Sequence, residues 1–183
     1  TLSLTTVNVT CNGANDGTVQ ANVTGGTSPY TYLWSNNTNN SFINNLSPNS
    51  YTLQVTDQNG CTINGNATII EPSILSLSAS ITNALCNGAN NGGIDLTVTG
   101  GTLGYTYSWN NGAITEDIAG VVAGTYTVLV TDANGCTAST SATVNEPAAL
   151  GANATITTPI TINGGTGVIT VSAAGGTPGY TGI

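Results

Sequence analysis

The chain has 183 residues, eight of them Asp or Glu and none of them Lys, Arg or His, so its formal net charge at pH 7 is −8. Without cationic side chains the protein cannot neutralise phosphates, which argues against nucleic acid and anionic membrane surfaces as partners. The usual general bases and amine nucleophiles are also missing. The scattered acids do not suggest the paired carboxylates of a glycosidase, so we expect no enzymatic activity.

The first 73 residues contain short segments in which every second side chain is apolar, a pattern that predicts β-strands. In chain order these segments are 4–9, 17–23, 30–34, 51–55 and 61–69, with a weaker one at 41–46. Clusters rich in Asn, Gly, Asp and Pro separate them, and no helical pattern competes. Six or seven short strands in one such stretch are typical of a small antiparallel sandwich.

The whole succession returns after 75 residues (86 − 11 for the first cysteine pair). Cys11 recurs as Cys86, Trp34 as Trp109, Cys61 as Cys136 and Glu71-Pro72 as Glu146-Pro147. A Gly-Gly-Thr triplet at 25–27 returns at 100–102 and 175–177, each time with a tyrosine in phase, at Tyr30, Tyr105 and Tyr180. The period predicts an all-β chain of tandem Ig-like antiparallel β-sandwich repeats at 1–73 and 74–148, with a partial third repeat at 149–183.

Each full repeat has two cysteines, 50 residues apart (61 − 11), whereas the third copy has Thr161 at the first cysteine position. Paired cysteines in small modules favour structural disulfides over a zinc site, because zinc would need closer cysteine spacing or His. Structural disulfides in turn indicate an extracellular location. If the strands reverse at every turn, Cys11 lies at the same end as Cys61, which predicts the pairs Cys11–Cys61 and Cys86–Cys136. Six strands that reverse at every turn would also put both termini of a repeat at one end, unless segment 41–46 crosses between sheets or a seventh strand exists.

Two sets of residues are candidates for binding. Tyr30, Tyr32 and Trp34 share one strand face, as do Tyr105, Tyr107 and Trp109, and such a row could stack on sugar rings, although a core tryptophan is the usual sandwich arrangement and is favoured. Asp16 and Asp57 are expected in loops at one end, where they could share a calcium ion. Asn91 replaces Asp16 in the next copy, which favours a turn role over calcium.

The segment Leu46-Ser-Pro-Asn-Ser-Tyr51 resembles the tyrosine corner of sandwich domains, in which the phenol hydrogen-bonds nearby backbone. We interpret it as scaffold.

Taken together, the motifs at 10–17, 25–34, 51–61 and Glu71-Pro72, and their second copies, resemble the SprB repeat of Bacteroidetes surface adhesins. The resemblance covers nearly the whole chain, and the third copy departs from it at Thr161 and at 164–167. It implies a very long secreted protein, exported by type IX secretion and tied to adhesion or gliding motility.

We therefore expect an extracellular structural protein of the cell surface, without cofactor or membrane insertion, that forms an adhesin stalk or a surface filament. Expected partners are other repeats of the same chain, neighbouring copies in a filament, and a surface polysaccharide, host surface or substratum. The alternatives are a carbohydrate-binding module that uses the aromatic strand and a filament subunit that polymerises by strand addition at 168–173. The chain itself is expected to be a window from a longer protein.

Overall fold

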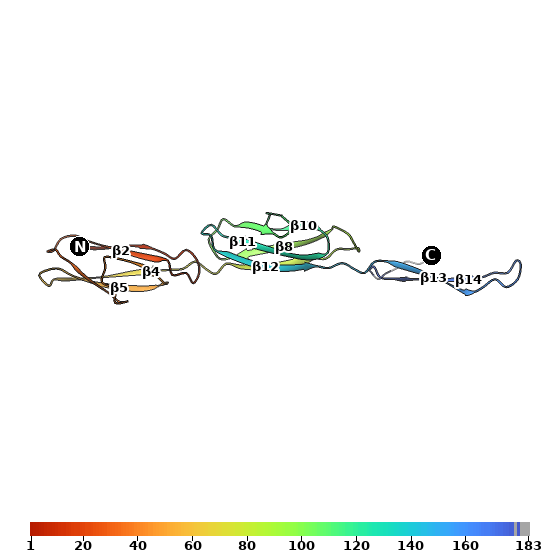
Figure 1. Ribbon diagram of the computed structural model, residues 1–183, viewed down its shortest axis with the longest axis horizontal. Helices are drawn as coiled ribbons and strands as arrows, with labels where there is room; N and C mark the ends of the chain where they lie inside the picture. Colours follow the sequence, from red (N-terminus) through yellow and green to blue (C-terminus); the bar gives the residue numbers. More distant parts are fainter. Residues whose placement is uncertain (178, 180–183) are drawn as a thin grey trace. The chain divides into compact units, whose positions relative to one another are not determined.

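A computed structural model describes residues 1–177 and 179, and every regular element in this range is a β-strand, as the alternation predicts (Figure 1). Tyr180 lies outside the described residues. The strands are β1 Leu2–Val7, β2 Gly17–Val23, β3 Thr31–Trp34, β4 Phe42–Leu46, β5 Asn49–Thr56, β6 Thr62–Ile69, β7 Ser76–Thr82, β8 Gly92–Thr99, β9 Thr106–Trp109, β10 Ile118–Val121, β11 Gly124–Thr131, β12 Thr137–Val144, β13 Gly151–Thr158 and β14 Val168–Ala174.

Contacts divide the chain into two compact units. The first consists of Thr1–Ser76, Val98–Tyr105 and Val130–Ala138, so it includes turns that belong to the second sequence repeat. The second consists of the remaining described residues. The boundaries 1–73, 74–148 and 149–183 follow the sequence period and stay a prediction.

The first repeat is a sandwich of two three-stranded antiparallel sheets, β1-β2-β4 and β3-β5-β6. Alternate side chains of each strand face inward, and burial along β5 follows this rule at Tyr51, Leu53 and Val55. The core is completed by residues from β2, β3, β4 and β6 and from the loop after β1, namely Val9, Val19, Ala21, Trp34, Ile43, Leu46, Ala67 and Ile69. The apolar alternation therefore locates both the strands and their inner faces.

The directions of β3 and β4 decide where the ends of the repeat lie. β2 starts beside Val7 and runs away from the loop that follows β1, while β3 starts at Thr31, which pairs with Thr56 before the β5–β6 hairpin. β3 therefore runs back toward that loop, and so does β4, which is antiparallel to β2. The segment at 41–46 thus crosses from one sheet to the other without reversing direction. This is one of the two alternatives predicted from the sequence; the other was a seventh strand.

Two ends of the repeat follow from this crossing. We call the end with residues 8–16 and Glu71-Pro72 the loop end, and the end with residues 25–27 and 57–61 the hairpin end. The amide of Thr24 donates to Thr1 O at the hairpin end. The side-chain amide of Asn12 donates to Pro72 O at the loop end. The chain therefore enters the first repeat at one end and leaves it at the other.

The second repeat has the same sheets, β7-β8-β10 and β9-β11-β12. After it, β13 and β14 form a two-stranded antiparallel sheet whose side chains are all exposed. The predicted fold class, tandem small antiparallel β-sandwich repeats, is confirmed.

The tyrosine corner is also confirmed in both full repeats. The hydroxyl of Tyr51 donates to Ser47 O at 2.9 Å, and the hydroxyl of Tyr126 donates to Val122 O at 2.9 Å. Each bond pins the short connection that leads into β5 or β11, so the residue acts as scaffold.

Candidate functional site

The loop end is held together by a glutamate that the sequence reasoning did not single out as functional. The Glu71 carboxylate accepts the Gly13 amide at 2.7 Å, next to the bond from Asn12 to Pro72 O. In the second repeat Glu146 accepts the Gly88 amide at 2.6 Å and the Asn87 side-chain amide at 2.9 Å. The signal was present, because Asn-Gly and Glu-Pro recur with the same period. Glu-Pro therefore fixes the outgoing chain against the loop that carries the first cysteine.

The hairpin end is built around an aspartate. The Asp57 carboxylate accepts the amides of Thr27 at 3.1 Å, Asn59 at 2.9 Å and Cys61 at 2.9 Å, so it joins the Gly-Gly-Thr loop to the β5–β6 hairpin. Asp132 repeats all three bonds, with Thr102 at 2.8 Å, Asn134 at 2.9 Å and Cys136 at 2.8 Å. This aspartate fixes the loop that carries the second cysteine.

These hydrogen bonds hold the pKa of the aspartates below the ordinary value of 3.8. For Asp57 the amides of Thr27 and Cys61 are the main cause. For Asp132 burial raises the pKa, but the amides of Thr102, Cys136 and Asn134 together lower it further. The pKa of Asp16 is lowered first by the Thr10 hydroxyl and then by the Thr10 amide. All three groups therefore favour the folded state in their charged form.

We predict that Asp57→Ala lowers the melting temperature at pH 7 by more than Asp16→Asn. Alanine leaves three amides at the hairpin end without their acceptor, whereas asparagine at position 16 reproduces the second repeat, where Asn91 accepts the Leu85 amide at 3.0 Å. Because the folded pKa of Asp57 is depressed, its contribution is complete above the unfolded pKa, near 4, and is lost as pH falls through the folded value. Thermal unfolding of both variants between pH 7 and pH 2 measures this, and a difference that persists unchanged at pH 2 would contradict it.

The calcium hypothesis for Asp16 and Asp57 is wrong in its geometry. Asp16 binds the Thr10 amide at 3.0 Å and the Thr10 hydroxyl at 2.6 Å at the loop end, while Asp57 lies at the hairpin end. The crossing of β4 separates the two loops that the strand count had placed together. Within residues 1–177 and 179, no group of three or more acidic, Cys or His side chains could hold a metal ion.

The predicted disulfides Cys11–Cys61 and Cys86–Cys136 are also wrong. The structure instead joins Cys11 to Cys136, whose Cα atoms lie 5.7 Å apart, and leaves Cys61 and Cys86 as exposed thiols. The reason is again the direction of β4, which puts Cys11 at the loop end and Cys61 at the hairpin end of the same repeat. The bond therefore joins the loop end of the first repeat to the hairpin end of the second, all within the first compact unit.

Polar contacts and a close backbone approach surround this disulfide. The Asn134 side-chain amide donates to Thr10 O at 3.0 Å, and the Cys136 sulfur lies 3.4 Å from the same oxygen. Nearby, the Gly101 amide donates to Ser73 O at 2.8 Å, so the linker after Glu71-Pro72 is bound by the Gly-Gly-Thr loop of the next repeat. Gly100, at φ +73°, lies so close to Ile74 O that a side-chain carbon there would overlap the oxygen. We call this set of contacts the junction.

We predict that Gly100→Ala costs about 2 kcal/mol more than Gly25→Ala, the matched change in the first repeat. Both glycines have positive φ, +73° and +77°, so both variants strain the backbone, but a methyl group at Gly25 meets nothing within 4 Å. The difference comes from overpacking against Ile74 O, which typically costs about 1–3 kcal/mol. Urea unfolding gives the two free energies, and hydrogen exchange at the Gly101 amide reports whether the junction has opened. Equal costs would show that the junction does not depend on this close approach.

The aromatic side chains of the two predicted binding strands face the cores of their repeats. Trp34 is 1% exposed and Trp109 4% exposed, and their indole N–H groups donate to Asn40 O and Thr115 O, each at 2.9 Å. Tyr30 and Tyr32 are half-buried and pack on the core of the first repeat, and Tyr105 and Tyr107 are half-buried in the second. The tryptophan rings therefore cannot stack on a sugar.

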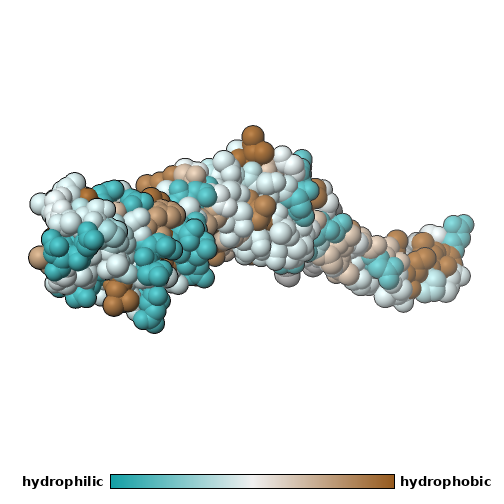
Figure 2. Space-filling model, turned by 60° about the vertical axis from the view of Figure 1, so that its left-hand side comes forward, coloured by the Kyte–Doolittle hydropathy of each residue, from teal (hydrophilic) through white to brown (hydrophobic). Residues whose placement is uncertain are grey.

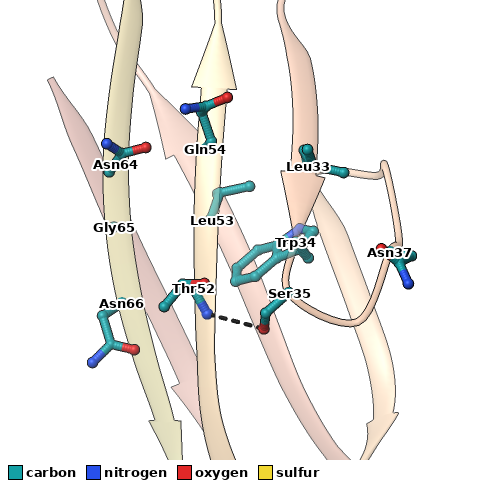
Figure 3. A pocket seen from close by; sticks show the side chains of 10 residues that line it. All are labelled: Leu33, Trp34, Ser35, Asn37, Thr52, Leu53, Gln54, Asn64, Gly65 and Asn66. Atoms are coloured by element: carbon teal, nitrogen blue, oxygen red, sulfur yellow. Dashed lines mark hydrogen bonds between the residues drawn. The ribbon is translucent and has the colours of Figure 1, made fainter.

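The outer face of β3-β5-β6 carries a shallow groove of about 790 Å³. Figure 3 shows the amide side chains of Gln54, Asn64 and Asn66 along it, with Leu33 and Trp34 on β3. The Thr52 amide donates to the Ser35 hydroxyl within it, at 3.2 Å. The exposed side chains of the groove are amides, the hydroxyls of Ser35 and Thr52, and a single leucine, so the groove offers no exposed aromatic platform.

The fold and its two ends define the chain as a tandem repeat of small antiparallel β-sandwiches, with a disulfide that joins one repeat to the next. The family model for the SprB repeat matches residues 3–39 and again residues 78–114, which supports the resemblance to this family. This family is associated with the cell surface, which supports an extracellular repeat protein of the adhesin type. No helix among the described residues is long and apolar enough to cross a membrane.

Among solved structures, the chain is similar to the crystal structure of Dpr2 Ig1-Ig2 in complex with DIP-Theta Ig1-Ig3. The sequence identity is 13% and the TM-score 0.29, over 85% of this chain and 68% of that one. The comparison with curated proteins found no match.

Proposed function

We propose that this chain is a stalk segment of a cell-surface adhesin, whose role is to hold an adhesive part away from the cell during adhesion or gliding, after export by type IX secretion. The observation that carries the proposal is the junction. The linker is held on one side by its own repeat, through Glu71 and the Gly13 amide, and on the other by the next, through Ser73 O and the Gly101 amide. A linker bound on both sides has little freedom to fold back.

The second linker has the same construction. Glu146 binds the Gly88 amide, and the Gly176 amide donates to Ala148 O at 2.7 Å. Proline after each glutamate also restricts φ near −65° and disfavours helix in the residue before it. Repetition of one junction supports a stalk, because identical steps add length with each repeat.

Small-angle scattering on chains of increasing repeat number tests the proposal. We expect the maximum dimension to rise almost linearly, by about 30–40 Å per repeat, since strands of about six residues and their end loops span that length. A dimension that grows only with the cube root of chain length would mean compact packing, and the stalk function would have to be abandoned.

A second candidate function is a filament subunit that polymerises by strand addition, and the C-terminal hairpin favours it. Ile156, Ile169 and Val171 are 66%, 64% and 66% exposed, and Figure 2 shows hydrophobic residues gathered on this hairpin. In the first repeat the corresponding strands β1 and β2 are covered by a second sheet. Analytical ultracentrifugation over a hundredfold concentration range distinguishes the candidates: Val171→Asp abolishes self-association in a filament subunit, and a stalk segment shows no association that this variant removes.

A further inference from the structure

Cys61 and Cys86, the two cysteines outside the disulfide, occupy the same positions in their repeats as Cys136 and Cys11 occupy in theirs. Cys86 lies one period after Cys11 (86 − 11), at the loop end of the second repeat, and Cys61 lies one period before Cys136 (136 − 61), at the hairpin end of the first. Cys11 and Cys136 are half-buried against each other, whereas Cys61 and Cys86 are exposed. Each thiol therefore lies on a loop or hairpin whose equivalent in the other repeat carries the Cys11–Cys136 disulfide.

The loop around Cys86 has the same conformation as the loop around Cys11. The amide of Ala89 donates to Cys86 O at 3.1 Å, as the amide of Ala14 donates to Cys11 O at 3.1 Å. The Leu85 amide donates to Asn91 Oδ1 at 3.0 Å, as the Thr10 amide donates to Asp16 Oδ1 at 3.0 Å. The loop that presents Cys11 to its partner is therefore already formed around Cys86.

The hairpin around Cys61 likewise matches the hairpin around Cys136. The Cys61 amide donates to Asp57 Oδ1 at 2.9 Å, and the Cys136 amide donates to Asp132 Oδ1 at 2.8 Å. Gly60 and Gly135, which precede these cysteines, have φ values of +83° and +85°. Asn59 donates to Thr27 Oγ1 at 2.9 Å, as Asn134 donates to Thr102 Oγ1 at 3.0 Å. The loop around Cys86 and the hairpin around Cys61 thus have the junction conformation without a disulfide bond.

Part of a second junction is already assembled at Cys86. In the third copy the Gly176 amide binds Ala148 O, as Gly101 binds Ser73 O. The Thr177 hydroxyl donates to Leu85 O at 3.4 Å, and this carbonyl is the counterpart of Thr10 O, the oxygen that Asn134 contacts beside the disulfide. The Gly-Gly-Thr loop of the third copy therefore lies where that of the second copy lies at the first junction.

We infer that Cys61 and Cys86 each form a disulfide with an adjacent copy of the repeat in the same polypeptide. Cys86 bonds the hairpin cysteine of the following copy, and Cys61 bonds the loop cysteine of the preceding one. Every junction with a cysteine at both positions then has one covalent cross-link of the Cys11–Cys136 kind, and no repeat has an internal one. The third copy has Thr161 at the loop position, so it forms no such link with a copy that follows it. In each step two thiols lose two protons and two electrons, and a small-molecule disulfide such as oxidised glutathione accepts them and becomes two thiols. This inference goes beyond the stalk function and does not depend on it.

The test extends the full chain at its C-terminus with a second copy of residues 34–73, which completes the third repeat and supplies one hairpin cysteine. The extended chain is refolded with oxidised and reduced glutathione, alkylated and mapped by non-reducing peptide mass spectrometry. We expect two cross-links, Cys11–Cys136 and Cys86 to the appended cysteine, with Cys61 alkylated in nearly every molecule. Cys61 is the internal control, because the extension gives it no preceding copy.

The matched control carries serine in place of the appended cysteine, and there both Cys61 and Cys86 should be alkylated while Cys11–Cys136 remains. A thiol count alone does not suffice, because bonds within repeats would also leave one free thiol in the extended chain. Recovery of Cys11–Cys61 or Cys86–Cys136 peptides, an alkylated Cys86 in the extended chain, or disulfide-linked dimers through Cys86 would each overturn the inference.

Discussion

Breaking the Cys11–Cys136 disulfide is expected to lower the free energy of unfolding of the chain by about 4–5 kcal/mol. The bond closes a loop with a sequence separation of 125 residues. In the chain-entropy model a loop of this size removes roughly that much free energy from the unfolded state. Cys136→Ser should show the loss in urea unfolding, and reduction of the wild-type chain should reproduce it.

Cys61→Ser and Cys86→Ser are the matched controls, since each removes an exposed thiol without touching a bond. Neither should change the free energy of unfolding by more than about 0.5 kcal/mol, the usual range for surface substitutions. Losses in Cys61→Ser as large as those in Cys136→Ser would restore the pairing within repeats.

Replacing Trp34 by alanine is expected to cost about 3–5 kcal/mol, the range for emptying a large aromatic site in a packed core. Trp34 is 1% exposed, and its indole N–H satisfies Asn40 O in the connection that leads into β4. The variant removes both the packing and this bond. Because Trp109 is then the only tryptophan left, its fluorescence reports the second repeat while circular dichroism reports the whole chain.

Leu33→Ala, on the same strand but 56% exposed, is the control and should change the free energy of unfolding by less than 1 kcal/mol. Trp34→Phe should fall between the two variants, because it keeps most of the ring and loses the hydrogen bond. A Trp34→Ala chain that is as stable as wild type but no longer binds a polysaccharide would instead support the carbohydrate-binding alternative.

Much of the fold could be predicted because period-2 alternation reports burial directly. Leu53 and Val55 face inward on β5 just as their spacing implies, and the recurrence of Trp34 as Trp109 located the core of the second repeat. The tyrosine corner at Tyr51 was also predictable, since its short Ser-Pro-Asn-Ser connection leaves the hydroxyl within reach of backbone. In these cases residues close in sequence specify the structure.

The disulfide could not be predicted in the same way, because alternation says nothing about strand direction. Phe42 to Leu46 is short and follows an Asn-rich turn that is compatible with either a reversal or a crossing. One reversal more or fewer moves Cys61 to the other end of the sandwich, so a single undetermined connection decided the cysteine pairing and the separation of Asp16 from Asp57. The roles of Glu71 and Gly100 could not be predicted for the same reason. They act at opposite ends of a repeat, and a reversal at every turn would have placed these two ends together.

The covalent link between repeats also sets how the chain responds to a pulling force. When tension is applied to the two termini, the backbone between Cys11 and Cys136 is bypassed, because the sulfur bridge carries the load directly from one residue to the other. At about 3.4 Å per extended residue, the 125-residue separation corresponds to roughly 400 Å of contour that cannot be drawn out even if both sandwiches unfold. Mechanical unfolding of the part between these two cysteines therefore yields very little extra length, and in an oxidised chain only the residues before Cys11 and after Cys136 can be drawn out.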